Sequence, residues 1–299
     1  GGSRQLNKLW QVNKRNIPII QRLDGMNWLH RIRRSSLRHF LRAEYGNIIL
    51  RTIRKHLACK IVYQSCFVRD WWDRVYKIQD KPSTVIYNGV DLDMYSPDGS
   101  EKRPETHTRL LVVEGNVMGG YEWGLENAIQ LALSLSDDQA TAHSRIEIMI
   151  VGRVAQELQS KWNQYIIDHG CDGLVSLKWG GVVPQEDIPG IDRTAHLLYS
   201  SDINPACPNS VIEALACGVP VIAFDTGALP ELIAGDAGRV VPYGGDPWKL
   251  EKPDISSLTE AASDLLLNQE RSRKAARKRA ECMFSLDMMV DNYLEVLLG

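Results

Sequence analysis

Asn209, Ser210 and Glu213 have the residue types and the spacing of a site that binds an anion and a hydroxyl-bearing ligand. They stand at the start of a small, apolar segment, which predicts a deeply buried helix between Pro208 and Gly218. The first N–H groups of a helix have no partner within it and lie at the positive end of its dipole, so they can hold a phosphate. A carboxylate one turn later can accept hydrogen bonds from the hydroxyls of a ribose.

The same spacing permits a second interpretation. Ser210 and Glu213 fit a capping box, in which Asn209 or Ser210 caps the helix and Glu213 only closes the first turn. Either way, the apolar run 221–224 predicts a buried parallel strand, and Pro230 marks the next helix start. The residues alone leave both roles of Glu213 open.

Strand and helix patterns alternate along the rest of the chain, which predicts an α/β protein with parallel sheets. Ligand sites in such sheets lie at the carboxyl ends of the strands. Asp24 follows the predicted strand 16–21, although Asp24 and Gly25 could form only a turn. Arg153 follows the predicted strand 145–151, and it could bind an anion or pair with Glu157 on the next helical turn.

A glycine-rich loop over 115–120 lies between a predicted strand and a predicted helix. Gly119 and Gly120 could allow the backbone to approach a phosphate closely. The loop does not match the pattern G-x-G-x-x-G, and loops of this composition are often simple turns.

The composition is that of a globular protein with room for sizeable cores, with 299 residues, 44% of them hydrophobic, and a formal net charge of −2. The charge is unevenly distributed. Residues 1–60 hold 14 Lys and Arg against Asp24 and Glu44, a formal charge of +12, so residues 61–299 carry −14. This asymmetry predicts an anionic partner for residues 1–60, although a solvated basic face would look the same.

Residues 28–57 form a basic, apolar-periodic stretch that predicts two helices separated at Gly46. Trp28 and the arginines after it resemble an interfacial membrane element, and an ordinary amphipathic helix with an arginine-rich outer face is the alternative. No apolar run approaches the length of a membrane span, and no signal peptide is visible. The six cysteines form no C-x-x-C pair. These features predict a reduced, cytoplasmic protein, with peripheral membrane attachment as an option.

No metal site is expected. The seven histidines show no ligand spacing such as H-x-x-x-H. The pair Asp91 and Asp93 has the letters of a metal-binding D-x-D motif, but it lies in a stretch that is expected to join two domains. No nucleic-acid partner is expected either.

The segment CPNSVIEALACGVPVIAFDTGALPEL, from Cys207 onward, resembles the donor-site signature of GT-B-fold glycosyltransferases of family 4, the retaining group. The phrase VIYNGVDLDMYSP resembles the end of that family's N-terminal domain. In the family, a first Glu precedes a second Glu with seven residues between them. Here the second is Glu213, and Pro205 stands in place of the first.

The resemblance implies two Rossmann-like domains, of which the N-terminal one is short or truncated. The expected divisions are 1–96 on the acceptor side, a linker over 97–108, a nucleotide-sugar-binding domain over 109–284, and a helix over 285–299 that packs back toward the first domain. The implied activity is metal-independent hexosyl transfer from a nucleotide-diphosphate sugar, with retention of configuration and no further cofactor. The acceptor would be a glycan, a lipid-linked molecule or another compound.

The resemblance also assigns roles to residues of this chain. Asp24 lies near the family's loop that faces the reaction, and it is the catalytic candidate. The donor-binding candidates are Gly119, Gly120, Arg153, Asn209, Ser210, Val211 and Glu213. The Arg and Lys with which the family usually binds the diphosphate are missing, because residues 114–124 contain neither. Pro205 and this missing pair motivate an alternative, a non-catalytic module that binds a nucleotide or a glycan. A sugar-nucleotide epimerase on the same fold is a third option.

Overall fold

The computed structural model describes residues 5–33, 36–117, 122–137 and 145–299, and the chain divides into two compact units. Unit 1 comprises Gly1–Asn88, Pro205–Cys207 and Met289–Gly299, and unit 2 comprises Gly89–Asn204 and Pro208–Met288. The chain passes into unit 2 after Asn88, which is earlier than the expected boundary at residue 96. The segment 97–108, expected to be a linker, belongs to unit 2.

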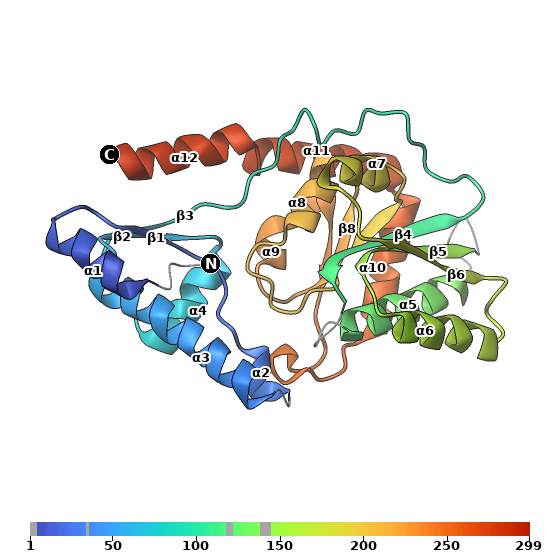
Figure 1. Cartoon of the computed structure of the whole chain (residues 1–299). Coiled ribbons are helices and arrows are strands. Elements are labelled where there is room, and N and C mark those ends of the chain that lie inside the picture. The colour runs from blue at the N-terminus through green and yellow to red at the C-terminus, as the bar shows by residue number, and fades with distance from the viewer. Residues whose placement is uncertain (1–4, 34–35, 118–121, 138–144) are drawn as a thin grey trace. The chain divides into compact units, whose positions relative to one another are not determined.

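Unit 1 is built on a parallel sheet with the strand order β1-β2-β3 (Figure 1). Its strands are β1 (Ile20–Leu23), β2 (Lys60–Tyr63) and β3 (Ser83–Val85). Its helices are α1 (Leu6–Lys14), α2 (Leu29–Ile32), α3 (Leu37–Thr52), which continues into a π-turn over Ile53–Leu57, α4 (Cys66–Tyr76), and the part of α12 (Leu286–Leu298) from Met289 on.

Helix α3 corrects the prediction of a break at Gly46. The helix runs through Gly46, and the interruption lies before Leu37, where Ser36 caps α3 by accepting a hydrogen bond from the His39 N–H at 3.3 Å. A Cβ on Gly46 would make only an ordinary contact with the Asn27 amide nitrogen at 3.5 Å, so the packing there does not require a glycine. A glycine inside a helix costs about 1 kcal/mol relative to alanine, so the packing of the whole helix outweighs it.

Unit 2 is built on a parallel sheet with the order β6-β5-β4-β7-β8-β9 (Figure 1). Its strands are β4 (Thr108–Asn116), β5 (Ile146–Arg153), β6 (Val175–Gly181), β7 (Leu197–Tyr199), β8 (Val221–Phe224) and β9 (Gly238–Val241). Its helices are α5 (Glu122–Asp137), α6 (Gln156–Asp168), α7 (Ile188–Arg193), α8 (Asn209–Ala216), α9 (Leu229–Leu232), α10 (Ile255–Leu267), α11 (Gln269–Met283) and the first residues of α12, with short 3-10 turns at Gln185–Asp187, Gly235–Ala237 and Pro247–Lys249.

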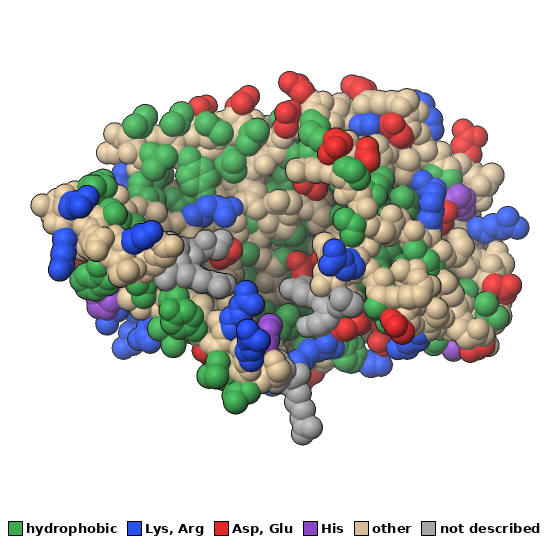
Figure 2. Space-filling view, in the orientation of Figure 1, with side chains coloured by type: hydrophobic (Ala, Val, Ile, Leu, Met, Phe, Trp, Pro, Cys, Tyr) green, Lys and Arg blue, Asp and Glu red, His purple; other side chains and the backbone are tan. Residues whose placement is uncertain are grey.

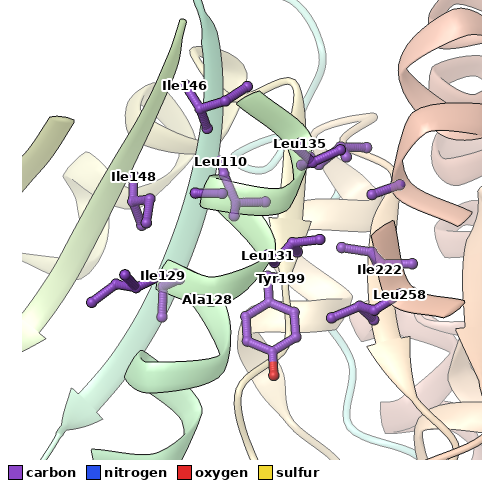
Figure 3. Packing of buried hydrophobic residues seen from close by; sticks show 14 of the residues in the cluster. Leu110, Ala128, Ile129, Leu131, Leu135, Ile146, Ile148, Tyr199, Ile222 and Leu258 are labelled. Atoms are coloured by element: carbon purple, nitrogen blue, oxygen red, sulfur yellow. The ribbon is translucent and has the colours of Figure 1, made fainter. Parts of the chain in front are cut away.

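The core of unit 2 lies between the sheet and helices α5, α6 and α10 (Figure 3). Leu110 and Ile148 project from the strands against Ile129 and Leu131 of α5, and Leu258 of α10 joins the same cluster. Each of these side chains is completely buried, which contributes about 1.5–3 kcal/mol per residue. Helices α7, α8 and α11 cover the opposite face, so the strands are apolar on both sides, as parallel sheets require (Figure 1).

Glycines and prolines set the bounds of α8 and of the strand after it. Gly218 adopts a left-handed conformation with φ of +67° directly after the C-cap residue Cys217, and Pro220 prevents the helix from continuing. The buried strand β8 and the helix α9, with Pro230 in its first turn, follow as the sequence predicts. This local order fixes where α8 ends, and the candidate site lies at the other end of the same helix.

Candidate functional site

Helix α8 starts at Asn209. Pro208 is its N-cap residue, and the Pro208 side chain makes no capping hydrogen bond. Asn209, Ser210 and Val211 therefore occupy the first three positions, whose N–H groups have no acceptor within the helix. The start of α8 supplies a compact set of N–H donors at the positive end of a helix dipole.

Glu213 does not form the capping box. Because the cap falls on Pro208, Glu213 is the fifth residue of the helix rather than the third, too far along to close the first turn. Its carboxyl group is partly buried, and this burial raises its pKa, whereas the nearby hydroxyl of Tyr95 lowers it. Because Glu213 takes no part in capping the helix, its carboxyl group can contact a ligand, and its ionised form accepts hydrogen bonds.

An acidic pair lies where the sheet of unit 2 changes direction. The chain moves outward from β4 through β5 to β6 and then returns to the other side of β4 as β7, so β4 and β7 flank the switch point where ligands bind in such sheets. Glu114 in β4 and Asp202 after β7 are both partly buried, and the desolvation of their carboxyl groups raises the pKa of each. Ser201 donates a hydrogen bond to Glu114 at 2.6 Å.

This acidic pair is not among the site residues predicted from the sequence. The signal was present, since Glu114 ends the apolar run RLLVV and Asp202 follows LLYSS. Only the topology brings the two strand ends together. Gly124 contributes to the close packing, because a Cβ there would lie 2.6 Å from the Ser201 carbonyl oxygen.

Arg153 ends β5, next in the sheet to β4. Its side chain is exposed, and among the described residues it makes no ion pair, so the alternative of pairing with Glu157 is not realised. Gly152, with φ of +134°, allows the backbone to pass the Glu114 carbonyl. The two other candidates on this side, Gly119 and Gly120, lie outside the described residues.

Asp24 lies in unit 1, directly after β1. Its backbone carbonyl accepts a hydrogen bond from the Trp72 indole at 2.9 Å, which fixes the loop. The side chain is half-buried. The donor-binding candidates belong to unit 2, so each unit positions its own set.

A polar network that the sequence did not predict adjoins Asp24 in the chain. Arg22 donates to the Asn88 side-chain oxygen at 2.6 Å and to the Tyr293 hydroxyl at 2.9 Å. Asn88 in turn donates to the Cys207 carbonyl at 3.1 Å. The Asn-Gly of the phrase VIYNGVD is therefore more than a turn, because Asn88 connects β1, Cys207 and the C-terminal helix within unit 1.

No group of three or more His, Cys, Asp or Glu side chains that could hold a metal occurs in the part of the chain that the structure describes. Within the same residues, no helix combines the length and the apolar character needed to cross a membrane. The six cysteines are all free thiols.

Comparison with known proteins covers the region that contains the switch point and α8. The family model for glycosyl transferases group 1 matches residues 111–268. A GDP-mannose-dependent alpha-(1-6)-phosphatidylinositol dimannoside mannosyltransferase of Mycobacterium tuberculosis is 24% identical over 226 residues, which are 74% of this chain and 53% of that protein. The chain spans about half, or less, of the length of the curated relatives it matches.

Solved structures of GT-B glycosyltransferases share the fold. Sucrose-phosphate synthase from Thermosynechococcus elongatus matches with a TM-score of 0.70 and 15% identity, over 96% of this chain and 69% of that one. HepE of Anabaena, solved with UDP and glucose, matches with a TM-score of 0.68 and 15% identity, over 98% and 75%. The expected fold class, α/β with Rossmann-like parallel sheets, is confirmed. Because the family model covers more than half of the sequence, the chain belongs to the glycosyl transferases of group 1.

Proposed function

We propose that this chain transfers a hexosyl group from a nucleotide-diphosphate sugar to an acceptor, with retention of configuration and without a metal ion. The observation that carries the proposal is the start of α8, where the first N–H groups of the helix and the carboxyl group of Glu213, which does not close the first turn, share one helix. Membership of the glycosyl transferases favours an enzyme over a non-catalytic binding module.

The N–H groups of Asn209, Ser210 and Val211 would bind the phosphate next to the sugar. As the bond to the sugar breaks, negative charge grows on that phosphate, and preorganised N–H groups stabilise it without reorganising. The leaving phosphate oxygen would itself take the proton of the acceptor hydroxyl. Glu213 would accept hydrogen bonds from the ribose hydroxyls.

Arg153 would supply the positive charge for the diphosphate that the family's missing Arg and Lys otherwise supply. It is exposed and free of an ion pair among the described residues, at the end of a strand next to β4. Gly119 and Gly120 remain candidates for a backbone approach to the same phosphates. Asp24 remains the candidate on the acceptor side.

The acceptor partner is proposed to be anionic, and a membrane surface is one form it could take. Helix α3 exposes a stripe of apolar side chains on the face away from its buried residues, namely Leu37, Leu41, Tyr45 and Ile48. Arg38 and Arg42 flank this stripe, and the acidic residue of α3, Glu44, is paired with Arg31 at 2.5 Å. On the face in Figure 2, Lys, Arg and hydrophobic side chains are frequent over the elements of unit 1. Peripheral attachment at a cytoplasmic membrane surface would follow.

A donor panel tests the proposal. The chain would be incubated with UDP-, GDP- and ADP-linked hexoses, with and without EDTA, and release of the nucleoside diphosphate would be measured. We expect one donor to be hydrolysed slowly without an acceptor, equally fast with EDTA, and to yield the retained anomer by NMR. Absence of turnover with every donor, or a requirement for metal, would contradict the proposal.

A further inference from the structure

Asn204 is a buried asparagine of unit 2 whose side-chain N–H groups are not used within the protein. The residue is 6% exposed, and its Nδ2 atom makes no hydrogen bond with the described residues. The side-chain amide carries two N–H donors, and a buried donor without an acceptor costs stability. Such groups are rare in native structures, so these donors require an explanation.

The loop that carries Asn204 follows β7 and is fixed at two points. Near its start, Ser201 donates to the carboxyl group of Glu114 in β4 at 2.6 Å. Further along, the Asn204 N–H donates to the hydroxyl of Thr226, which follows β8, at 3.4 Å. Because β7 lies between β4 and β8 in the sheet, these two contacts hold the loop at the carboxyl ends of three adjacent strands, next to the switch point.

The backbone conformation of Asn204 is also special. Its φ of +55° lies in the left-handed region, which is uncommon for residues other than glycine and which asparagine tolerates better than most. The contact with Thr226, itself 4% exposed, fixes the backbone at this point. The side-chain amide therefore projects from a constrained position, as a preorganised ligand-binding group requires.

The groups at the same strand ends indicate which kind of ligand the amide suits. Glu114 belongs to the end of β4, and Asp202 lies on the same loop as Asn204. An ionised carboxylate repels a diphosphate, whereas it accepts hydrogen bonds from hydroxyl groups. An amide N–H can donate to the oxygen of such a hydroxyl, because a hydroxyl both donates and accepts. An uncharged sugar therefore fits these strand ends better than a phosphate, which suits the first N–H groups of α8.

We propose that the side-chain amide of Asn204 donates a hydrogen bond to a hydroxyl oxygen of the hexosyl group in the bound nucleotide-diphosphate sugar. The inference rests on the proposed function, because it assigns a residue to the sugar part of the same site. The sugar hydroxyl supplies the acceptor that the amide lacks among the described residues. Asn204 thereby contributes to the affinity for the sugar and not to that for the nucleotide.

The test removes the amide in two ways. Asn204→Gly deletes the side chain and permits the left-handed backbone, and Asn204→Asp keeps the shape but replaces the N–H donors with an oxygen. Asn16→Gly is the matched control, because Asn16 has nearly the same backbone conformation, with φ of +56°, and is exposed. Titration calorimetry would compare UDP, GDP and ADP with UDP-glucose, GDP-mannose and ADP-glucose, and urea unfolding would be measured without ligand.

For the nucleotide sugar that the wild type binds, we expect Kd to rise about three- to tenfold in both Asn204 variants, as for the loss of one neutral hydrogen bond. It should stay at the wild-type value in Asn16→Gly. The Kd of the matching nucleoside diphosphate should not change in any variant, because this ligand has no hexosyl group. Asn204→Gly should unfold at the same urea concentration as the wild type or a higher one, because the amide that it loses has no partner in the ligand-free protein.

Equal Kd values for the nucleotide sugar in the wild type and both Asn204 variants would overturn this role and leave the proposed function standing. An equal loss with the nucleoside diphosphate alone would also overturn it, by placing the amide at the diphosphate. A loss of stability with unchanged affinity would show that a buried water, not the sugar, is the partner of the amide. A wild type that binds none of the six ligands would contradict the proposed function, and this inference with it.

Discussion

The two units of this protein are stabilised in different ways. Unit 2 has an apolar core, which is built around strands that are buried on both faces. Leu110, Ile148 and Leu258 are completely buried in this core. Unit 1 encloses a charged side chain, Arg54, and leaves the apolar stripe of α3 exposed. The difference indicates that the interior of unit 2 is stabilised mainly by apolar packing. Unit 1 depends on specific polar contacts and offers apolar surface to a partner.

Arg54 is the centre of the polar core of unit 1. It is 1% exposed, and it donates to the Tyr63 hydroxyl at 3.0 Å, to the Lys77 carbonyl at 3.0 Å and to the Asp73 carboxylate. A buried charge is tolerated only when its donors are all engaged, because its desolvation is costly. The fold of unit 1 is therefore sensitive to the loss of a single partner.

The largest loss of stability is expected from a substitution at Gly152 in unit 2, because there is no room for a side chain there. A Cβ on Gly152 would lie 1.6 Å from the Glu114 carbonyl oxygen, and its φ of +134° disfavours any other residue. Gly152→Ala should therefore lower the free energy of unfolding on the order of 4 kcal/mol or more. Urea denaturation measures this, with Gly173→Ala as the control, because nothing lies within 4 Å of a Cβ there. Equal stability of the two variants would contradict the tight packing at the switch point.

The next largest loss of stability is expected in the polar core of unit 1. Asp73→Ala leaves the Arg54 guanidinium buried without its carboxylate, which should cost about 3 kcal/mol. Asp264→Ala removes a comparable partner from Arg239, but that pair is partly exposed, with a distance of 2.7 Å, and should cost less than about 1 kcal/mol. Thermal and urea unfolding of both variants measure the difference. If Asp73→Ala were as mild as its control, the contrast between the units would be lost.

The third effect concerns the ligand rather than the fold. Glu213→Gln keeps the size of the side chain but removes the ionised acceptor, so it should cost on the order of 1.5–3 kcal/mol of nucleotide affinity, roughly ten- to a hundredfold in Kd. Unfolding curves without ligand should change little, because Glu213 does not cap its helix. Titration calorimetry with UDP, GDP and ADP measures the affinity, and Glu157→Gln, an exposed change on α6, is the control. Equal Kd values for wild type and Glu213→Gln would remove Glu213 from the site.

The sequence was sufficient for features that depend on local chemistry. The alternation of strand and helix predicted the parallel sheets. Ser65, whose hydroxyl accepts from the Val68 N–H at 3.2 Å, is an example of such local chemistry, because it caps α4. Gly218 and Pro220 ended α8 at the predicted place. These outcomes depend on backbone conformations that a few neighbouring residues decide.

Features that depend on distant residues were wrong or missed. The break predicted at Gly46 fails because packing of the whole helix outweighs one glycine. The capping box fails because Pro208 takes the cap position, which the residue types at 209–213 could not reveal. The acidic pair of Glu114 and Asp202 was missed because it joins two strand ends that only the topology brings together.

The smallest change in stability is expected from a substitution in the exposed apolar stripe of α3. The same substitution tests whether this stripe binds a membrane. Leu41 is 59% exposed, so Leu41→Ser should change the free energy of unfolding by less than about 0.5 kcal/mol. If the stripe inserts into an anionic membrane, the same change should weaken binding to vesicles of phosphatidylcholine and phosphatidylglycerol by about 1 kcal/mol, because an apolar side chain is lost from the interface. Leu267→Ser on α10, at 63% exposure, is the matched control and should bind like the wild type. Wild-type binding should also weaken with salt, since Arg38 and Arg42 attract the anionic surface. Equal binding by both variants, or wild-type binding to pure phosphatidylcholine that salt does not affect, would show that α3 does not meet the membrane.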